Sequence, residues 1–341
     1  MSDLRLRASR LERQNDDSSD RPEFRSIRFS TANLPERQRI SAWREHYART
    51  ALRVEIEPHE NAPFDCMLTS CTLPDLQILL AQMSAVRVLR TRELAADGND
   101  DLALIINRAG LLAGSARGHD VVLGEGDAVL LSSDEASIFQ RNASGSSLAL
   151  RVPRATLVGN VVDLEDVIMR PIPRAAAALR LLESYTGAIL DDELVGLPEI
   201  RSTAVAHVHD LVALTLGATA GAAERSEIGG VPAARLKLAK LFVANNSNRQ
   251  ALGVRHVAEH LRVAERTVQQ LFERDGTTFS AFLLAQRLSR ARRMLIDPKY
   301  EGSAISTIAY DVGFGDLSYF NRSFKLRFGA TPREVRATNR A

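Results

Sequence analysis

The fold is decided by Ala304-Ile-Ser-Thr-Ile-Ala-Tyr-Asp-Val-Gly313-Phe-Gly-Asp316-Leu-Ser-Tyr-Phe-Asn-Arg-Ser-Phe-Lys-Leu-Arg-Phe328. Apolar residues recur at three- and four-residue steps on both sides of Gly313, which is the period of an amphipathic helix. Gly313 is expected to end the first helix, because glycine adopts the left-handed conformation without a Cβ clash. Asp316 or Ser318 can cap the second helix. The stretch therefore predicts two short helices joined by a tight turn, with Phe314 filling the angle between them.

Residues 254–272 repeat this plan earlier in the chain. Val257 and Leu261 belong to one predicted helix, Val263 fills the turn, and Val268 and Phe272 are buried by the next helix. An apolar stripe over residues 278–296 predicts a longer helix that bridges the two units. A helix-turn-helix places its second helix in the major groove of DNA. Residues 232–341 are thus predicted to be an all-α domain with two helix-turn-helix modules.

The charge distribution supports a nucleic-acid partner for this part of the chain. Residues 232–341 contain 19 lysines and arginines against 9 acidic residues, whereas residues 1–231 contain 25 against 33. A basic patch attracts the phosphate backbone, and an acidic domain is repelled by it. We therefore expect the C-terminal third to contact double-stranded DNA and the N-terminal part to stay away from it.

The N-terminal part reads as a β-rich domain over residues 25–220. Short apolar segments separated by Gly, Asp and Pro turns predict strands, which is typical of a small barrel or jelly roll. The predicted strands are 64–72, 76–82, 86–92, 102–107, 121–123, 128–131, 137–140 and 148–152. Amphipathic helices are predicted over 35–50, 173–190 and 197–216; the stripes of the last two need a partner, either within the chain or in a second subunit. Residues 1–24 are predicted to be a disordered tail, and the Gly-rich residues 221–231 a linker.

Residues 121–131 resemble the turn-and-strand signature of cupin barrels. Cupin enzymes hold a metal through histidines and a glutamate, but Ser137 stands where such a histidine would fall and His119 is alone. Neither a metal nor another cofactor is expected, and the barrel is interpreted as a small-molecule pocket or a docking surface. Cys66 and Cys71 match no zinc spacing and are expected to be reduced core residues. No apolar run approaches the roughly 20 residues of a membrane span, so a cytoplasmic protein is expected.

Residues 232–341 resemble the DNA-binding domain of the AraC/XylS family of bacterial transcription regulators, most specifically in residues 308–334. Residues 25–220 more weakly resemble the sensor half of the subgroup with a cupin-like N-terminal domain. The resemblance implies an α+β protein of two domains that binds promoter DNA and contacts RNA polymerase. It also implies that the two recognition helices enter successive major-groove segments, about 34 Å apart. One departure is Arg262, which occupies a turn position where glycine is usual.

Side chains that point away from the buried stripes are the candidates for DNA contacts. In the first recognition helix Arg266, Gln269 and Gln270 are expected to read bases, since arginine pairs with guanine and glutamine with adenine. In the second helix we expect Ser318 and Asn321 near bases and Arg322 on a phosphate or a base. The outward sets are Glu265, Arg266, Gln269 and Gln270, and Leu317, Ser318, Asn321 and Arg322. The expected core aromatic residues are Tyr319, Phe320, Phe324 and Phe328.

Three functions remain open from the sequence. The favoured one is a transcription regulator, more specifically an activator, whose N-terminal domain binds a small effector. A second is a DNA-binding protein whose barrel only forms a homodimer and senses no ligand. The third, an enzyme fused to a DNA anchor, has no nucleophile elbow, phosphate loop or ligand cluster to support it. We therefore expect no enzymatic activity.

Overall fold

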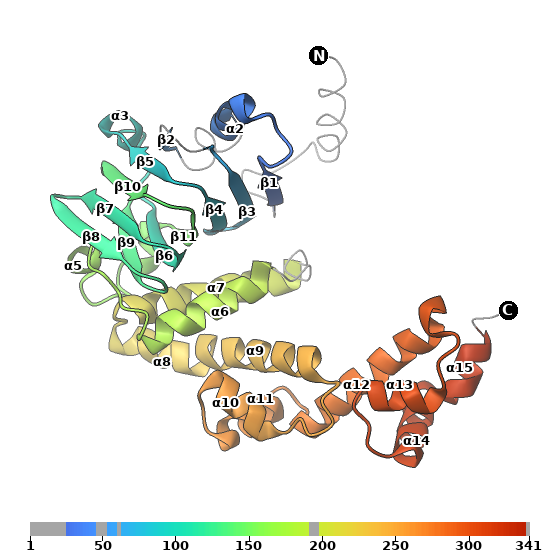
Figure 1. Ribbon diagram of the computed structural model, residues 1–341. Coiled ribbons are helices and arrows are strands. Elements are labelled where there is room, and N and C mark those ends of the chain that lie inside the picture. The colour runs from blue at the N-terminus through green and yellow to red at the C-terminus, as the bar shows by residue number, and fades with distance from the viewer. Residues whose placement is uncertain (1–24, 46–52, 60–62, 191–197, 339–341) are drawn as a thin grey trace.

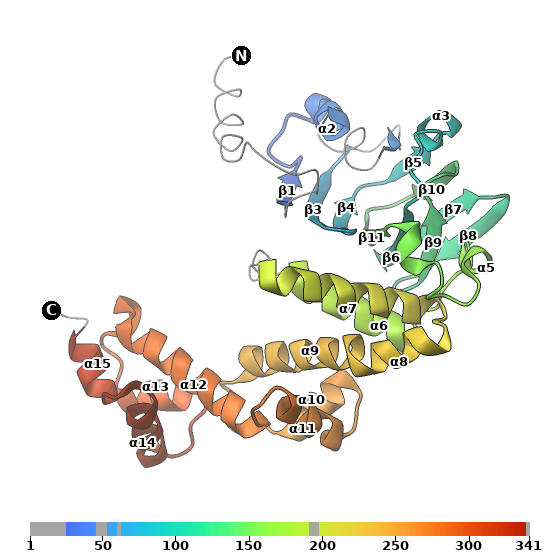
Figure 2. The same cartoon turned by 180° about the vertical axis from the view of Figure 1, so that it is seen from behind.

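The computed structural model describes residues 25–45, 53–59, 63–190 and 198–338. Figures 1 and 2 show a β-rich domain at one end, a helical domain at the other, and a layer of helices between them. The fold class predicted from the sequence, a cupin-like β domain followed by an all-α domain, is confirmed. The predicted tail, residues 1–24, lies outside the described residues, as does the end of the helix predicted over 35–50.

Within the described residues the strands form two antiparallel sheets, with the orders β1-β3-β4-β11-β6-β9 and β2-β5-β10-β7-β8. The eight predicted strands are present, and three more join them: β1, β2 and β7. The sequence did not indicate β7 because its residues are mainly Ala, Gly and Ser, which have little β-propensity. The strand bounds are β1 Arg25–Ser30, β2 Glu55–Pro58, β3 Cys66–Leu73, β4 Leu76–Met83, β5 Val86–Arg90, β6 Leu102–Ala109, β7 Leu112–Ala116, β8 His119–Leu123, β9 Ala128–Ser132, β10 Ser137–Arg141 and β11 Gly145–Val152.

The outer face of the six-stranded sheet is covered by two helices, α6 Ala177–Leu190 and α7 Pro198–Leu216. Because side chains alternate along a strand, Leu148 and Leu150 of β11 face these helices while Ala149 faces the other sheet. The same core contains Leu182 and Val208, which are fully buried. The apolar stripes of α6 and α7, whose partner the sequence left open, therefore pack within the chain.

Short helices close the ends of the β domain. Trp43, at the end of α2, is buried and packs edge-on against Phe64. Cys66 belongs to the same cluster and Cys71 to the core under α6 and α7; both are free thiols, as predicted. The bounds are α2 Glu36–Trp43, α3 Arg92–Ala95, α4 Arg154–Leu157 and α5 Leu164–Val167.

Residues 221–231, which were predicted to be a linker, are helical on both sides of Gly229. Helix α8 spans Ala220–Ile228 and is followed directly by α9, Gly230–Asn246. The small residues that suggested flexibility serve close helix packing instead. Ser226 is buried, and its hydroxyl donates to the carbonyl oxygens of Ala222 and Asp210, at 3.0 and 3.2 Å.

Helix α9 contributes to two hydrophobic cores. Near its start, Val231 and Ala234 lie in the core formed with α6 and α7. Further along, Ala239 and Val243 lie in the core of the first helix-turn-helix module. The side chains on a single continuous helix therefore tie the β domain to the DNA-binding domain (Figure 1).

Each helix-turn-helix module has its own core, and α12 crosses both. Phe279 and Leu283 of α12 pack in the first core, and Leu288 and Leu295 pack in the second. This confirms the bridging helix predicted from the apolar stripe. The bounds are α10 Val254–Leu261, α11 Glu265–Arg274, α12 Phe279–Ile296, the 3-10 turn η3 Pro298–Tyr300, α13 Ile305–Asp311, α14 Leu317–Phe328 and α15 Pro332–Thr338.

Candidate DNA interface and barrel cavity

The two modules use the same turn. Gly313 has φ 98° and Arg262 has φ 54°, so both residues are left-handed. In each module the following residue donates its backbone N–H to a helix carbonyl five residues earlier: Val263 to Ala258, and Phe314 to Ala309, both at 3.0 Å. Arg262 therefore adopts the conformation that glycine has in the second module, which accounts for the departure noted in the sequence.

Replacing Arg262 with glycine should stabilise the first module. A left-handed conformation costs a non-glycine residue about 1–2 kcal/mol, and the larger backbone entropy of glycine in the unfolded chain offsets part of that gain. We expect Arg262→Gly to raise the free energy of unfolding by about 0.5–1 kcal/mol, measured by urea denaturation.

The control is Arg255→Gly, an exposed position inside α10, which should lower the free energy of unfolding by about 1 kcal/mol. A loss of stability in Arg262→Gly as large as that in Arg255→Gly would contradict the assignment of strain to Arg262.

Helix α11 presents the predicted polar face to solvent. Glu265, Arg266, Gln269 and Gln270 are all exposed, while Val268, Leu271 and Phe272 are buried. The buried residues recur at helical spacing and fix the rotation of α11 about its axis. The four candidate side chains of the first recognition helix therefore lie on one open face.

Asp316 caps the start of helix α14, and its carboxylate accepts the backbone N–H of Tyr319, as predicted. Ser318, Asn321 and Arg322 are exposed. Leu317 is not part of the outward face, because it packs against the core of the second module. These positions leave three of the four second-helix candidates available to DNA.

Tyr319 was predicted to be a core aromatic residue, and this is wrong. Its side chain is 47% exposed, whereas Phe320 and Phe324 are fully buried and Phe328 is partly buried. Tyr319 lies one helical step from Phe320, so it turns towards the solvent side next to Ser318. It joins the exposed face of α14 as a further candidate for a DNA contact.

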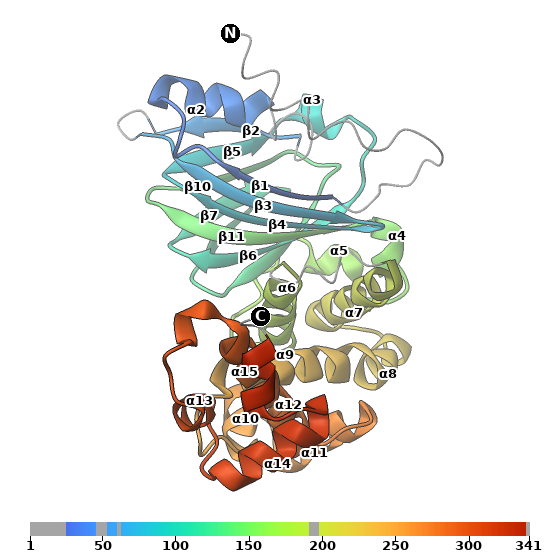
Figure 3. The same ribbon diagram turned by 90° about the vertical axis from the view of Figure 1, so that its right-hand side faces the viewer.

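The recognition helices α11 and α14 lie on the side of the molecule away from the β domain (Figure 3). The loop between α9 and α10 is held against α12 by Arg287, which donates to the carbonyl oxygens of Ser247 and Arg249 at 2.8 Å and of Gln250 at 3.2 Å. Gly313 of the second module contacts the same loop. Arg287 and Gly313 therefore fix one module against the other.

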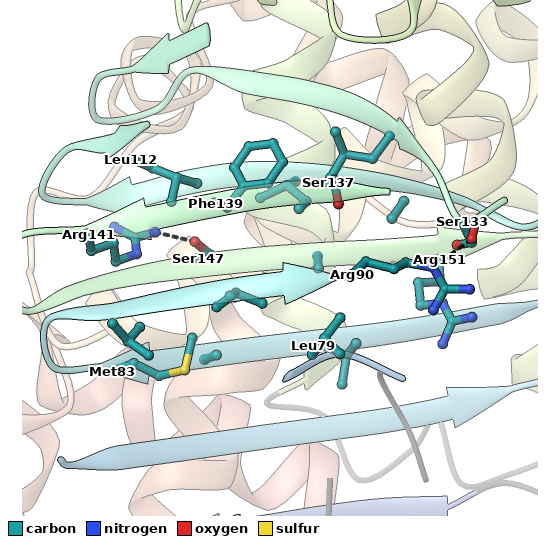
Figure 4. A pocket seen from close by; sticks show the side chains of 18 of the residues that line it. Leu79, Met83, Arg90, Leu112, Ser133, Ser137, Phe139, Arg141, Ser147 and Arg151 are labelled. Atoms are coloured by element: carbon teal, nitrogen blue, oxygen red, sulfur yellow. Dashed lines mark hydrogen bonds between the residues drawn. The ribbon is translucent and has the colours of Figure 1, made fainter. Parts of the chain in front are cut away.

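The β domain has a cavity of about 180 Å³ between its two sheets. Inward positions of several strands carry small side chains, among them Ala81, Ala103 and Ala149, so the two sheets do not fill the space between them. Figure 4 shows Arg141 with Ser147 at one end and Arg90 with Arg151 at the other. The rest of the lining is mainly apolar and includes Leu79, Met83, Leu112 and Phe139.

Comparison with known proteins covers both domains. The family of AraC-binding-like domains matches residues 43–217, and a family of helix-turn-helix domains matches residues 257–338. The transcriptional activator RhrA of Rhizobium meliloti (strain 1021) is 30% identical over 316 residues, which cover 92% of this chain and 97% of RhrA. This chain belongs to the AraC family.

Other AraC-family proteins match over shorter or more divergent ranges. The transcriptional activator AggR of Escherichia coli is 36% identical over 78 residues, or 23% of this chain and 28% of AggR. The crystal structure of the AraC-like transcriptional activator CuxR has a TM-score of 0.48 and 20% identity, covering 78% of this chain and 95% of CuxR.

As a member of the AraC family, this chain is a DNA-binding transcription regulator with a cupin-like N-terminal domain. The family is one of regulators and not of enzymes. In the part of the chain that the structure describes, no group of three histidine, cysteine or acidic side chains is placed to hold a metal ion. No helix among the described residues is both long and apolar enough to cross a membrane.

Sequence reasoning missed several residues that shape this AraC-family protein. Tyr319 was assigned to the wrong face, and the sequence indicated no role for Arg287 beyond its place in the bridging helix. Arg141 was not singled out, although an arginine between the apolar Phe139 and the small residues of β11 breaks the expected strand pattern. That break in the pattern was the available signal for a polar group inside the barrel.

Proposed function

We propose that this AraC-family protein is an effector-responsive transcription activator. The observation that supports the proposal is the cavity inside the β domain, which is apolar, enclosed by both sheets and bordered by charged side chains. Sites for small molecules usually have this composition. The related RhrA and AggR are named transcriptional activators, which favours activation over repression.

In this proposal the effector acts by linkage. It must bind the DNA-competent arrangement more tightly than the idle one, because a ligand with equal affinity for both shifts nothing. Helix α9 connects the β domain directly to the first helix-turn-helix module, because its residues lie in the cores of both. A homodimer and a contact with RNA polymerase belong to the same proposal, as does a cytoplasmic location, where promoter DNA is found.

The proposed DNA contacts follow the exposed faces of α11 and α14. Arg266, Gln269 and Gln270 would reach base edges from the first recognition helix, with Glu265 at its start. Ser318, Asn321 and Arg322 would contact DNA from the second helix. If the two helices occupy successive turns of one DNA face, the contacted segments are about 10 base pairs apart.

Salt-titrated binding of the full chain to promoter fragments from its own genomic neighbourhood tests the proposal, with unrelated DNA as competitor. Footprinting should show two adjacent protected major-groove segments. Binding no tighter than to the competitor, across a genomic library, would exclude the regulator function. If DNA binding is specific but no small molecule changes it, the alternative holds, in which the barrel only dimerises.

Gln269→Ala should relax base preference at one position of the binding site. Loss of a bidentate base contact costs about 1–3 kcal/mol of discrimination, whereas loss of a phosphate contact weakens all sequences alike. The measurement is the binding-site preference of the variant over a randomised DNA pool. Gln38→Ala, an exposed glutamine on α2 of the β domain, is the control and should change nothing. An unchanged preference in Gln269→Ala would remove Gln269 from the base-reading set.

A further inference from the structure

Arg141 stands out among the polar groups of the cavity. Its side chain lies at the end of β10 and is only 4% exposed. It donates to the carbonyl oxygens of Ala109 and Ser146, at 2.9 and 3.2 Å, and to the hydroxyl of Ser147. All these acceptors are neutral. Among the described residues, no carboxylate lies within salt-bridge distance of Arg141.

The two arginines at the opposite end each have a carboxylate partner in the protein, and Asp97 is shared with Arg53, at 2.6 Å. Arg90 pairs with Asp97, and Arg151 pairs with Asp101, both at 3.2 Å. A buried charge is costly unless an opposite charge accompanies it. Burial alone lowers the pKa of Arg141, and no carboxylate acts in the opposite direction. Among the described arginines that line the cavity, Arg141 is thus the one without a carboxylate partner.

The backbone of β11 leaves space for the guanidinium of Arg141. A Cβ at Gly145 would overlap a terminal nitrogen of Arg141, so the guanidinium fills the space that a side chain would take. The register of β11 against β6 also shifts between Ser146 and Ser147, where both residues supply acceptors to Arg141. The guanidinium is therefore held in place by the backbone around it.

We propose that the cavity binds a small amphipathic monoanion, a carboxylic acid whose carboxylate pairs with Arg141 and whose apolar body lies along Leu79 and Phe139. This inference rests on the proposed effector response and assigns its chemical class. A carboxylate supplies the counter-charge that the protein withholds, and arginine binds carboxylates by paired, charge-assisted hydrogen bonds. The small inward residues Ala81, Ala103 and Ala149 leave the volume for the apolar body.

The test uses matched pairs of probes on the full chain without DNA: octanoate against 1-octanol, and 3-phenylpropionate against 3-phenylpropanol. Titration calorimetry should show that at least one acid binds about tenfold or more tightly than its alcohol. Because both members of a pair have the same apolar body, the ratio of their affinities measures the contribution of the carboxylate. Equal binding within both pairs, or no binding of either acid, would overturn the proposal.

Arg141→Gln should remove the preference, so that the acid binds no better than its alcohol. Arg87→Gln is the matched control, since Arg87 lies opposite Gln140 in the register of β5 and β10 but pairs with Glu57 at the surface. Ala149→Leu should weaken acid and alcohol alike by filling the cavity. An unchanged preference for the acid in folded Arg141→Gln would contradict the assignment. If that variant does not fold, the comparison of each acid with its alcohol on the natural chain still tests whether the cavity prefers a carboxylate.

The same titrations repeated with promoter DNA separate this inference from the proposed function. If an acid binds through Arg141 but leaves DNA affinity unchanged, the ligand class stands and the effector response is wrong. If DNA affinity responds to the alcohols as strongly as to the acids, the effector response stands and the anion assignment is wrong.

Discussion

Gly313→Ala should unfold the second helix-turn-helix module locally and abolish its contribution to DNA binding. Gly313 has φ 98°, and a Cβ there would lie 2.6 Å from the carbonyl oxygen of Ser247 and 2.9 Å from that of Asn248. The left-handed backbone alone costs about 1–2 kcal/mol, and a clash with two backbone atoms cannot be relieved by a side-chain rotation. We expect a total loss of about 3 kcal/mol or more.

Hydrogen exchange of the amides in α13 and α14 measures this loss where it occurs. Gly329→Ala is the matched control, since Gly329 also has a positive φ, 73°, in the same module, but a Cβ there would meet no atom within 4 Å beyond its chain neighbours. It should cost only about 1 kcal/mol. Similar losses in the two variants would show that the contact with the α9–α10 loop is unimportant.

Arg287→Met should loosen the two modules from each other. The guanidinium donates to three carbonyl oxygens of the loop after α9, and methionine keeps the apolar stem but makes none of these bonds. Hydrogen bonds from a charged donor contribute about 1.5–3 kcal/mol, so we expect a loss of about 2–3 kcal/mol of stability. Burial lowers the pKa of Arg287, but the group stays charged at neutral pH.

The looser placement of the two modules should also weaken DNA binding that requires both modules at once. A site with both major-groove segments should be bound at least about tenfold more weakly, while a site with one segment is bound as before. Arg293→Met, an exposed position on the same helix, is the control for stability. An equal loss on one-segment and two-segment sites would mean that Arg287 does not set the relative placement of the modules.

The sequence predicted those elements whose pattern is imposed by burial on one side. Both helix-turn-helix modules, the bridging α12 and eight strands were predicted because their apolar residues recur at the period of the element. The residues of β7 and α8 are mostly small, and small residues give no periodic signal. Ala222 and Ser226 are buried by close helix contact, so a composition typical of linkers forms a packed helix.

The exposed face of α14 was predicted less well than the helix itself. Ser318 and Asn321 are exposed as expected, but Leu317 and Tyr319 exchange roles, because the turn at Gly313 sets the rotation of α14 and periodicity alone does not. The strand pattern signals a polar group at Arg141, but its surroundings could not be predicted, because they depend on Gly145 and on a register shift in β11. Such features arise from pairing between strands that are distant in sequence.

Helix α9 also determines where the chain can be divided. A fragment that begins at residue 257, where the matched helix-turn-helix family begins, would lose Ala239 and Val243 from the first module and leave Phe272 partly uncovered. A fragment that begins at residue 230 would keep them but expose Val231 and Ala234 to water. Neither half can be excised without damage to a core, so an exchange of sensor domains between relatives should join the two chains within α9 and preserve its helical phase.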